Sequence, residues 1–196
     1  MSMKIQTGVI MISEIKGYLN RLKVTIDMMD LDEINAVINV IKLAYDNNKT
    51  IYIFGNGGSG STASHIVCDI NKGVSYGKTK RFKMICLNDN IATVLAYAND
   101  VSYDDIFIEQ LKNYLLSGDV VIGISGSGNS MNVIKAIDYA NENGGITIGF
   151  CGYDGGKLKN NAKYSIHAKI DDMQISEDIH LIMGHIIMRI FQDLDL

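Results

Sequence analysis

The sequence contains no proline and only three cysteines among its 196 residues. Because proline often marks the ends of helices and strands, its absence leaves element boundaries defined only to within a few residues. Cys68, Cys86 and Cys151 form no C-x-x-C pair and lie within apolar stretches. This pattern excludes a disulfide framework and indicates free thiols in a reducing compartment.

Basic charge and long apolar runs are also missing. The formal net charge is -4, whereas a general nucleic-acid binder normally displays a basic face. Apolar runs such as residues 120–124 are too short to cross a bilayer, and residues 1–13 lack the basic start and cleavage site of a signal peptide. We therefore expect a cytoplasmic protein that binds neither nucleic acid nor membranes.

The composition predicts one globular domain over residues 1–196. A hydrophobic content of 47% suffices for a substantial core, and no low-complexity linker divides the chain. Apolar residues at helical spacing predict two amphipathic helices, 10–29 and 31–47, ahead of the first strand. This N-terminal segment, 10–48, is more apolar than one layer on a sheet requires, so we expect it to join subunits.

Beyond this segment, predicted strands alternate with predicted helices. Such alternation predicts an α/β fold with a parallel sheet, helices on both faces and right-handed crossovers. The strands are expected at 50–54, 82–87, 119–124, 146–150 and 164–168, and the helices at 61–70, 91–97, 106–116, 131–143 and 176–194.

Two of the predicted strands run into glycine- and serine-rich turns. These turns are Gly55-Asn56-Gly57-Gly58-Ser59 and Ser125-Gly126-Ser127-Gly128-Asn129-Ser130. In a parallel sheet such turns gather at one edge, where backbone N–H groups and helix N-termini favour an anion. Glycine lets the backbone approach a ligand closely, and serine adds hydroxyl donors. One such turn is ordinary turn chemistry, but two at equivalent places predict a site for a small phosphorylated ligand.

Neither turn matches a nucleotide-binding pattern. The first turn has no P-loop lysine, and no G-x-G-x-x-G with an acidic partner follows the first strand. These absences argue against ATP and dinucleotides. A cationic group between the first two strands either rims a phosphate pocket or forms a solvated loop; its members are Lys72, Lys78, Lys80, Arg81 and Lys83.

A second group of residues has acid–base or metal-binding character. His65 and Asp69 are four residues apart on a predicted helix, and therefore on one face. Glu177 and His185 are eight residues apart, about 80° around the last helix, and can share a side. Two imidazoles and two carboxylates can hold zinc or exchange protons without it, although for any one of these residues alone a structural role is the favoured interpretation. His180 and His167 are weaker candidates, because His180 points about 140° away from His185 and His167 lies in a short strand.

These residues, in this order, resemble the sugar isomerase (SIS) domain family, and within it the phosphoheptose isomerases. The resemblance covers about residues 10–190 and rests on the two turns, His65, Asn99-Asp100 and the closing pair His180 and His185. It implies a three-layer α/β/α sandwich on a five-stranded parallel, flavodoxin-like sheet. It also implies a homotetramer with sites between subunits, and isomerisation of sedoheptulose 7-phosphate to D-glycero-D-manno-heptose 7-phosphate.

The resemblance also implies roles for individual residues. Ser125, Ser127 and Ser130, with Gly126, resemble the phosphate-binding turn, while Asn56, Gly57 and Ser59 resemble contacts to sugar or phosphate. Asp89 resembles an acidic substrate contact. His185 resembles the catalytic histidine, and His65 a zinc ligand. Zinc, held by His65, Asp69, Glu177 and His185, is the expected cofactor.

The chain departs from the resembled isomerases at two positions. Asp69 stands where they carry a glutamate base, and Glu177 where they carry glutamine. A cis-enediol mechanism would use Asp69 or Glu177 as the base and His185 on the oxygen or second carbon. Isomerisation of another sugar phosphate stays open, as does a non-catalytic role like that of the SIS-domain protein that associates with the DnaA initiator.

Overall fold

The structure, a computed structural model, describes residues 2–194, with side chains from residue 11 onward. The ends of the predicted domain, residues 1 and 195–196, lie outside the described part. Its strands are β1 (Thr50–Gly55), β2 (Lys83–Cys86), β3 (Val120–Ser125), β4 (Ile146–Cys151) and β5 (Tyr164–His167). Its α-helices are α1 (Ser2–Asp27), α2 (Leu31–Asp46), α3 (Gly57–Cys68), α4 (Ile91–Asp100), α5 (Ile108–Tyr114), α6 (Met131–Glu142), α7 (Gly156–Asn161) and α8 (Met173–Asp193).

The five strands form one parallel sheet in the order β2-β1-β3-β4-β5. This is the flavodoxin-like order, and it confirms the predicted fold class. The three central strands are buried almost throughout. Burial of both faces explains why they appear in the sequence as continuous apolar runs rather than alternating patterns.

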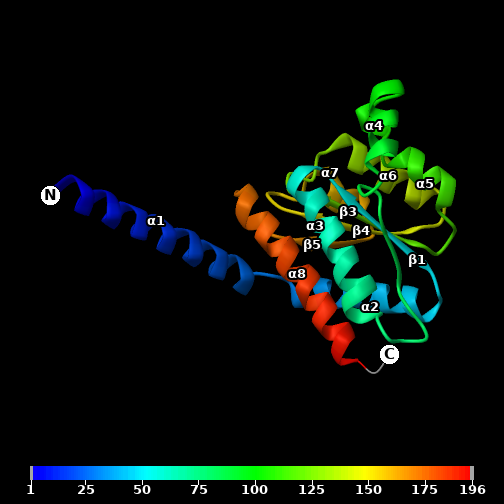
Figure 1. Cartoon of the computed structure of the whole chain (residues 1–196), viewed down its shortest axis with the longest axis horizontal. Helices are drawn as coiled ribbons and strands as arrows, with labels where there is room; N and C mark the ends of the chain where they lie inside the picture. The colour runs from blue at the N-terminus through cyan, green and yellow to red at the C-terminus, as the bar shows by residue number, and fades with distance from the viewer. Residues whose placement is uncertain (1, 195–196) are drawn as a thin grey trace.

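Helices cover both faces of the sheet, as Figure 1 shows. One core cluster joins the strands to α2, α3 and α8, and includes Ile53, Ile122 and Phe191. The other joins them to α5, α6 and α7, and includes Phe54, Phe107 and Val133. The two clusters are the two interfaces of a three-layer sandwich.

Helix α1 differs from the others because it extends away from this sandwich (Figure 1). It is anchored near its end by the hydroxyl of Tyr18, which donates to the Asp178 carboxylate at 2.6 Å, and by an Arg21–Asp172 ion pair at 3.1 Å. Many of its large apolar side chains are exposed, among them Ile12, Ile15, Leu19 and Ile26. Across the described residues, no helix combines the length and apolarity that a bilayer span needs.

Several details differ from the predicted elements. Helix α3 begins at Gly57, four residues earlier than expected, and passes at Asp69 into a π-helix, Asp69–Val74. A 3-10 helix, Tyr103–Asp105, precedes α5, and α7 was not predicted. Helix α7 has only six residues and begins at Gly156, directly after Gly155, so it offers too short a pattern for periodicity to detect.

Candidate active site at the carboxyl edge of the sheet

The carboxyl ends of β1 and β3 open onto a cavity of about 310 Å³. The chain leaves these neighbouring strands towards opposite faces of the sheet, which is where open α/β sheets bind ligands. The cavity brings together all the predicted binding residues except Asp89: Asn56, Gly57, Ser59, Ser125, Gly126, Ser127 and Ser130. It is also lined by Gly58, Ile124, Met173 and Glu177.

The second turn is shaped to hold an anion. Gly128 has a φ of 66° and donates its N–H to the carbonyl of Ser125 at 2.9 Å, which closes the turn. Ser130 is the N-cap of α6, and its hydroxyl lies 3.1 Å from that of Ser125. Two hydroxyls and the N-terminus of a twelve-residue helix therefore face one place, as phosphate binding requires.

The first turn depends on close backbone packing. A β-carbon on Gly55 would meet the carbonyl of Ile124 and the β-carbon of Ser59 at 2.8 Å each, so only glycine fits between the two strand ends. The side chain of Asn88, just after β2, holds the backbone of Gly55 in place. Its Nδ2 donates to the Gly55 carbonyl at 2.8 Å, and its Oδ1 accepts from the Gly55 N–H at 3.2 Å.

Neither Asn88 nor the partners of Asn56 were predicted from the sequence. The amide of Asn56 is hydrogen-bonded to Asn132 and Tyr103, so much of its capacity serves the protein rather than a ligand. The available signals were an asparagine after a strand and another in the first turn of a helix. Both are also common turn and capping residues, so these signals are weak.

Three of the four predicted metal ligands lie together. The Nε2 atoms of His65 and His185 are 3.1 Å apart, and Oδ2 of Asp69 lies 3.3 Å from the first and 3.7 Å from the second. Ligand atoms at the corners of a tetrahedral zinc site, with bonds of about 2.1 Å, are about 3.4 Å apart. The three atoms therefore fit three corners of such a site and leave the fourth open.

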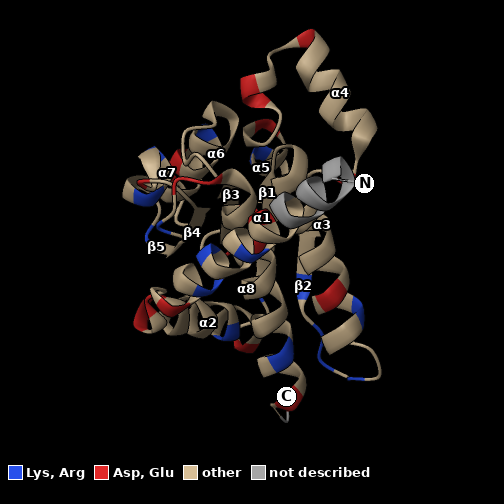
Figure 2. Ribbon diagram, turned by 90° about the vertical axis from the view of Figure 1, so that its left-hand side faces the viewer, with Lys and Arg blue, Asp and Glu red and all other residues tan. Residues whose placement is uncertain are grey.

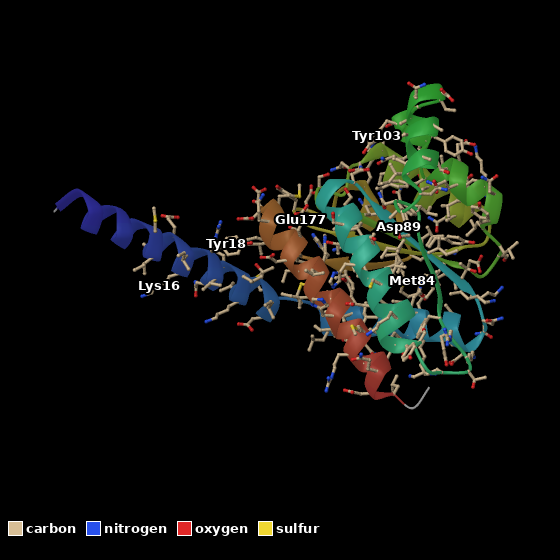
Figure 3. The ribbon with its side chains drawn as sticks, in the orientation of Figure 1. Lys16, Tyr18, Met84, Asp89, Tyr103 and Glu177 are labelled. Carbon is tan, nitrogen blue, oxygen red and sulfur yellow. The ribbon has the colours of Figure 1, made fainter. Side chains whose placement is uncertain are left out.

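Glu177 does not belong to this three-residue cluster within one chain. Its carboxylate lies against Gly58, where a β-carbon would meet the two oxygens at 2.6 and 2.8 Å, and it lines the cavity near the start of α3 (Figure 3). Helices α3 and α8 run side by side in the same direction, so Glu177 faces Gly58 while Gly184 faces Ile66. Eight residues of helix place Glu177 about 12 Å from His185 along the axis.

Asp89 and the cationic group also lie apart from the cavity. Asp89 lines a different hollow, with Val67 and Asn71, and Figure 3 shows it on the other side of α3 from Glu177. Lys80 and Lys83 donate to the carbonyls of Asp46 and Asn48 at the amino edge of the sheet. Figure 2 shows this basic loop at the far end from α4, which follows the carboxyl end of β2. None of the five cationic residues lines the cavity, so they do not rim the phosphate site, although Lys72 lies in the π-helix and Lys83 in β2 rather than in a loop.

The two weaker histidines have structural positions. His180 is 1% exposed and packs on Phe150, and neither ring nitrogen has a hydrogen-bond partner among the described residues. Burial lowers the pKa of His180 to about 4. His167 lies between the carbonyl of Tyr153, at 3.0 Å from Nε2, and the ammonium of Lys159, at 3.1 Å from Nδ1. Burial lowers its pKa as well, so its Nε2–H donates to Tyr153 while its Nδ1 accepts from Lys159.

Known proteins with similar sequences include phosphoheptose isomerases. The chain is 38% identical over 163 residues to the phosphoheptose isomerase of Thermodesulfovibrio yellowstonii, with 82% of this chain and 80% of that protein covered. It is 33% identical over 170 residues to that of Clostridium acetobutylicum, with 87% and 86% covered.

A solved structure has the same fold. A phosphoheptose isomerase from Francisella tularensis superposes with a TM-score of 0.84 at 21% identity, and the match covers 93% of this chain and 98% of that one. The SIS domain model matches residues 14–152, from α1 to the loop after β4. The chain therefore belongs to the SIS domain family, in its phosphoheptose isomerase branch.

Proposed function

We propose that this protein is an isomerase that converts sedoheptulose 7-phosphate to D-glycero-D-manno-heptose 7-phosphate. The observation that carries the proposal is the cavity at the strand switch, where two Gly/Ser turns and two helix N-termini converge on one place. The relatives named phosphoheptose isomerase, at 32 to 38% identity over most of the chain, support the choice of sugar.

The cavity binds the phosphate and fixes the sugar chain. Ser125, Ser127 and Ser130 donate their hydroxyls to the phosphate, and the N-terminus of α6 favours its charge. Glu177 lies in the same cavity and accepts hydrogen bonds from sugar hydroxyls, as an ionised carboxylate does. Holding the sugar in one geometry lowers the activation barrier of the reaction, because the entropy cost of orienting the reacting groups is met on binding.

Asp69 and His185 carry out the proton transfers. The carboxylate of Asp69 takes the proton from the carbon next to the carbonyl, which gives a cis-enediol, and returns it to the neighbouring carbon. His185, with Nε2 at 3.7 Å from Oδ2 of Asp69, moves a proton between the two sugar oxygens. Each proton removed is returned, so the reaction needs no oxidant or reductant.

His65, Asp69 and His185 would hold zinc, because their ligand atoms match three corners of a tetrahedral site. Bound zinc polarises a carbonyl and stabilises developing negative charge. With zinc on Nε2 of His185 and Oδ2 of Asp69, those two atoms would not be free to exchange protons, so the cluster would act either as the proton relay or as the metal site.

We also propose a homotetramer with active sites shared between subunits. About 12 Å separates Glu177 from His185 in one chain, and the side chains of His65 and His185 are half exposed. A second copy can therefore bring its three-residue cluster to this cavity. Helix α1 supplies a surface for assembly, since its apolar residues at 12, 15, 19, 22 and 26 alternate in spacing of three and four, as in a coiled-coil seam.

The cytoplasm suits this chemistry. All three cysteines are free, and burial raises the pKa of the Cys86 and Cys151 thiols to about 12, which keeps both protonated. A sugar-phosphate isomerase also works where phosphorylated metabolites are made.

The proposal is tested by incubating the protein with sedoheptulose 7-phosphate and following the sugar by NMR. We expect appearance of the heptose aldose and exchange of one carbon-bound hydrogen with deuterated water. A panel of other ketose phosphates serves as the comparison. Turnover of another sugar with none of sedoheptulose 7-phosphate would contradict the choice of substrate, and binding without turnover of any sugar would support the non-catalytic alternative.

A further inference from the structure

The two Gly/Ser turns belong to separate βα units, so the width of the phosphate cavity depends on how α3 and α6 are held together. Asn56, the N-cap residue of α3, and Asn132, in the first turn of α6, form a reciprocal pair. The Nδ2 of each donates to the Oδ1 of the other at 2.9 Å. Two antiparallel hydrogen bonds fix both the distance and the orientation between the two helix starts.

The Nδ2 of Asn132 can donate to Oδ1 of Asn56 only in this arrangement of the two helix starts. It is 1% exposed, and its Oδ1 also accepts the N–H of Val133 at 2.9 Å. If α3 moved away from α6, the buried NH₂ of Asn132 would lose its acceptor, and an unpaired buried donor is unfavourable. The pair therefore resists widening of the cavity.

Tyr103 adds a third hydrogen bond to the pair. It lies in the 3-10 helix between α4 and α5 (Figure 3) and is 54% exposed. Its hydroxyl donates to Oδ1 of Asn56 at 2.9 Å. With bonds from Asn132 and Tyr103, both lone pairs of this oxygen are used. The same 3-10 helix is fixed to α6 by an ion pair of 2.9 Å between Asp105 and Lys135. Tyr103 thus reaches Asn56 from a segment that is itself held on α6.

We propose that Tyr103 and Asn132 are positioning residues of the phosphate site, acting through Asn56 rather than through contact with the substrate. Tyr103 does not line the cavity, and the oxygen of Asn56 has no capacity left for a ligand. The inference rests on the proposed function, because it assumes that the cavity takes phosphate. Asn56 then limits the width of the cavity as well as lining it.

The positioning role is tested by removing one tyrosine hydroxyl at a time. Tyr103→Phe removes the hydrogen bond to Asn56. The matched control is Tyr76→Phe, which changes an exposed tyrosine in the turn after the π-helix. Calorimetry measures the affinity for inorganic phosphate. Steady-state kinetics with sedoheptulose 7-phosphate measure kcat and KM. We expect Tyr103→Phe to weaken phosphate binding and raise KM by the same factor, about 2- to 10-fold for one hydrogen bond, with kcat within twofold of wild type. Tyr76→Phe should change neither.

A double-mutant cycle with Asn132→Ala tests whether both residues act through Asn56. We expect the two losses of phosphate affinity to be less than multiplicative, because each removes part of the same support. If Asn132→Ala does not fold, Tyr103→Phe alone decides. Unchanged phosphate affinity in Tyr103→Phe overturns the positioning role while leaving the isomerase intact. A fall in kcat at constant KM assigns Tyr103 to the chemistry instead, and a wild-type protein that binds no phosphate overturns both proposals.

Discussion

The carboxylate of Glu177 lies directly against Gly58, so that a β-carbon on Gly58 would meet its oxygens at 2.6 and 2.8 Å. A glycine in the first turn of α3 thus makes the room in which a side chain from α8 enters the cavity. Gly58→Ala is expected to displace this carboxylate and to lower kcat/KM about 10- to 100-fold, since misplacement by about 1 Å has that effect.

The control for this substitution is Gly17→Ala, because nothing lies within 4 Å of the added carbon in α1. Steady-state kinetics and circular dichroism on both variants separate loss of the site from loss of the fold. Wild-type kinetics in Gly58→Ala would show that the position of Glu177 is unimportant.

The phosphate site is tested at the second turn. Ser127→Ala combined with Ser130→Ala removes two of the three hydroxyls but leaves the backbone N–H groups. We expect KM for the sugar phosphate to rise at least about tenfold, as loss of two hydrogen bonds to a charged group implies. Unchanged affinity by calorimetry would place the phosphate elsewhere.

The sheet and the cavity were predictable because their signals are local. Strands such as β1 and β3 are short apolar runs ending in glycine or serine, and parallel pairing then brings their turns to one edge. The start of α3 was predicted four residues late, because Gly57 and Gly58 have poor helix propensity. Packing against α8 and β1 outweighs that propensity here.

The arrangement of the acid–base residues was only partly predictable. His65 and Asp69 share a turn of one helix, so their proximity follows from spacing alone. Glu177 and His185 share a side of α8, but the angle around a helix says nothing of the distance along it. Which of them meets His65 depends on the parallel alignment of α3 and α8, which only the tertiary packing reveals.

Metal binding distinguishes the three-residue cluster from the predicted four-residue site. We expect His185→Ala and His65→Ala to lose bound zinc, and Glu177→Gln, at a position against Gly58, to retain it. Elemental analysis measures zinc per chain, and turnover is measured before and after chelator treatment.

Three outcomes would change this assignment. Loss of zinc from Glu177→Gln would mean that Glu177 of another copy joins the site. Full turnover by metal-free protein would remove zinc from the reaction, and full turnover by His185→Ala would invalidate the proposed catalytic site.

Assembly through α1 is tested by placing charge on its apolar stripe. Ile15→Lys with Leu19→Lys puts two ammonium groups among side chains that are exposed in one chain and buried in the proposed assembly. We expect light scattering to report a smaller species and activity to fall with it, because the proposed sites are shared. Asn20→Lys adds charge to the same helix off the stripe and should leave the mass unchanged. A wild-type monomer at micromolar concentration would contradict both the tetramer and the shared site.

His180 makes stability depend on pH. Burial lowers its pKa from 6.5 to about 4, so between these values the unfolded chain binds a proton that the folded chain does not. Stability from this group is therefore present above pH 6.5 and is lost as the pH falls towards 4. The expected loss between pH 7.5 and 4.5 is about 2.5 kcal/mol of unfolding free energy.

Urea denaturation at these two pH values, at one fixed protein concentration, measures that loss. His180→Leu keeps an apolar side chain on Phe150 and removes the titrating ring, so its loss should be smaller by about 2.5 kcal/mol. If His180→Leu is as sensitive to acid as the wild type, other groups cause the sensitivity, because a neutral leucine cannot bind the proton that the unfolded histidine takes up.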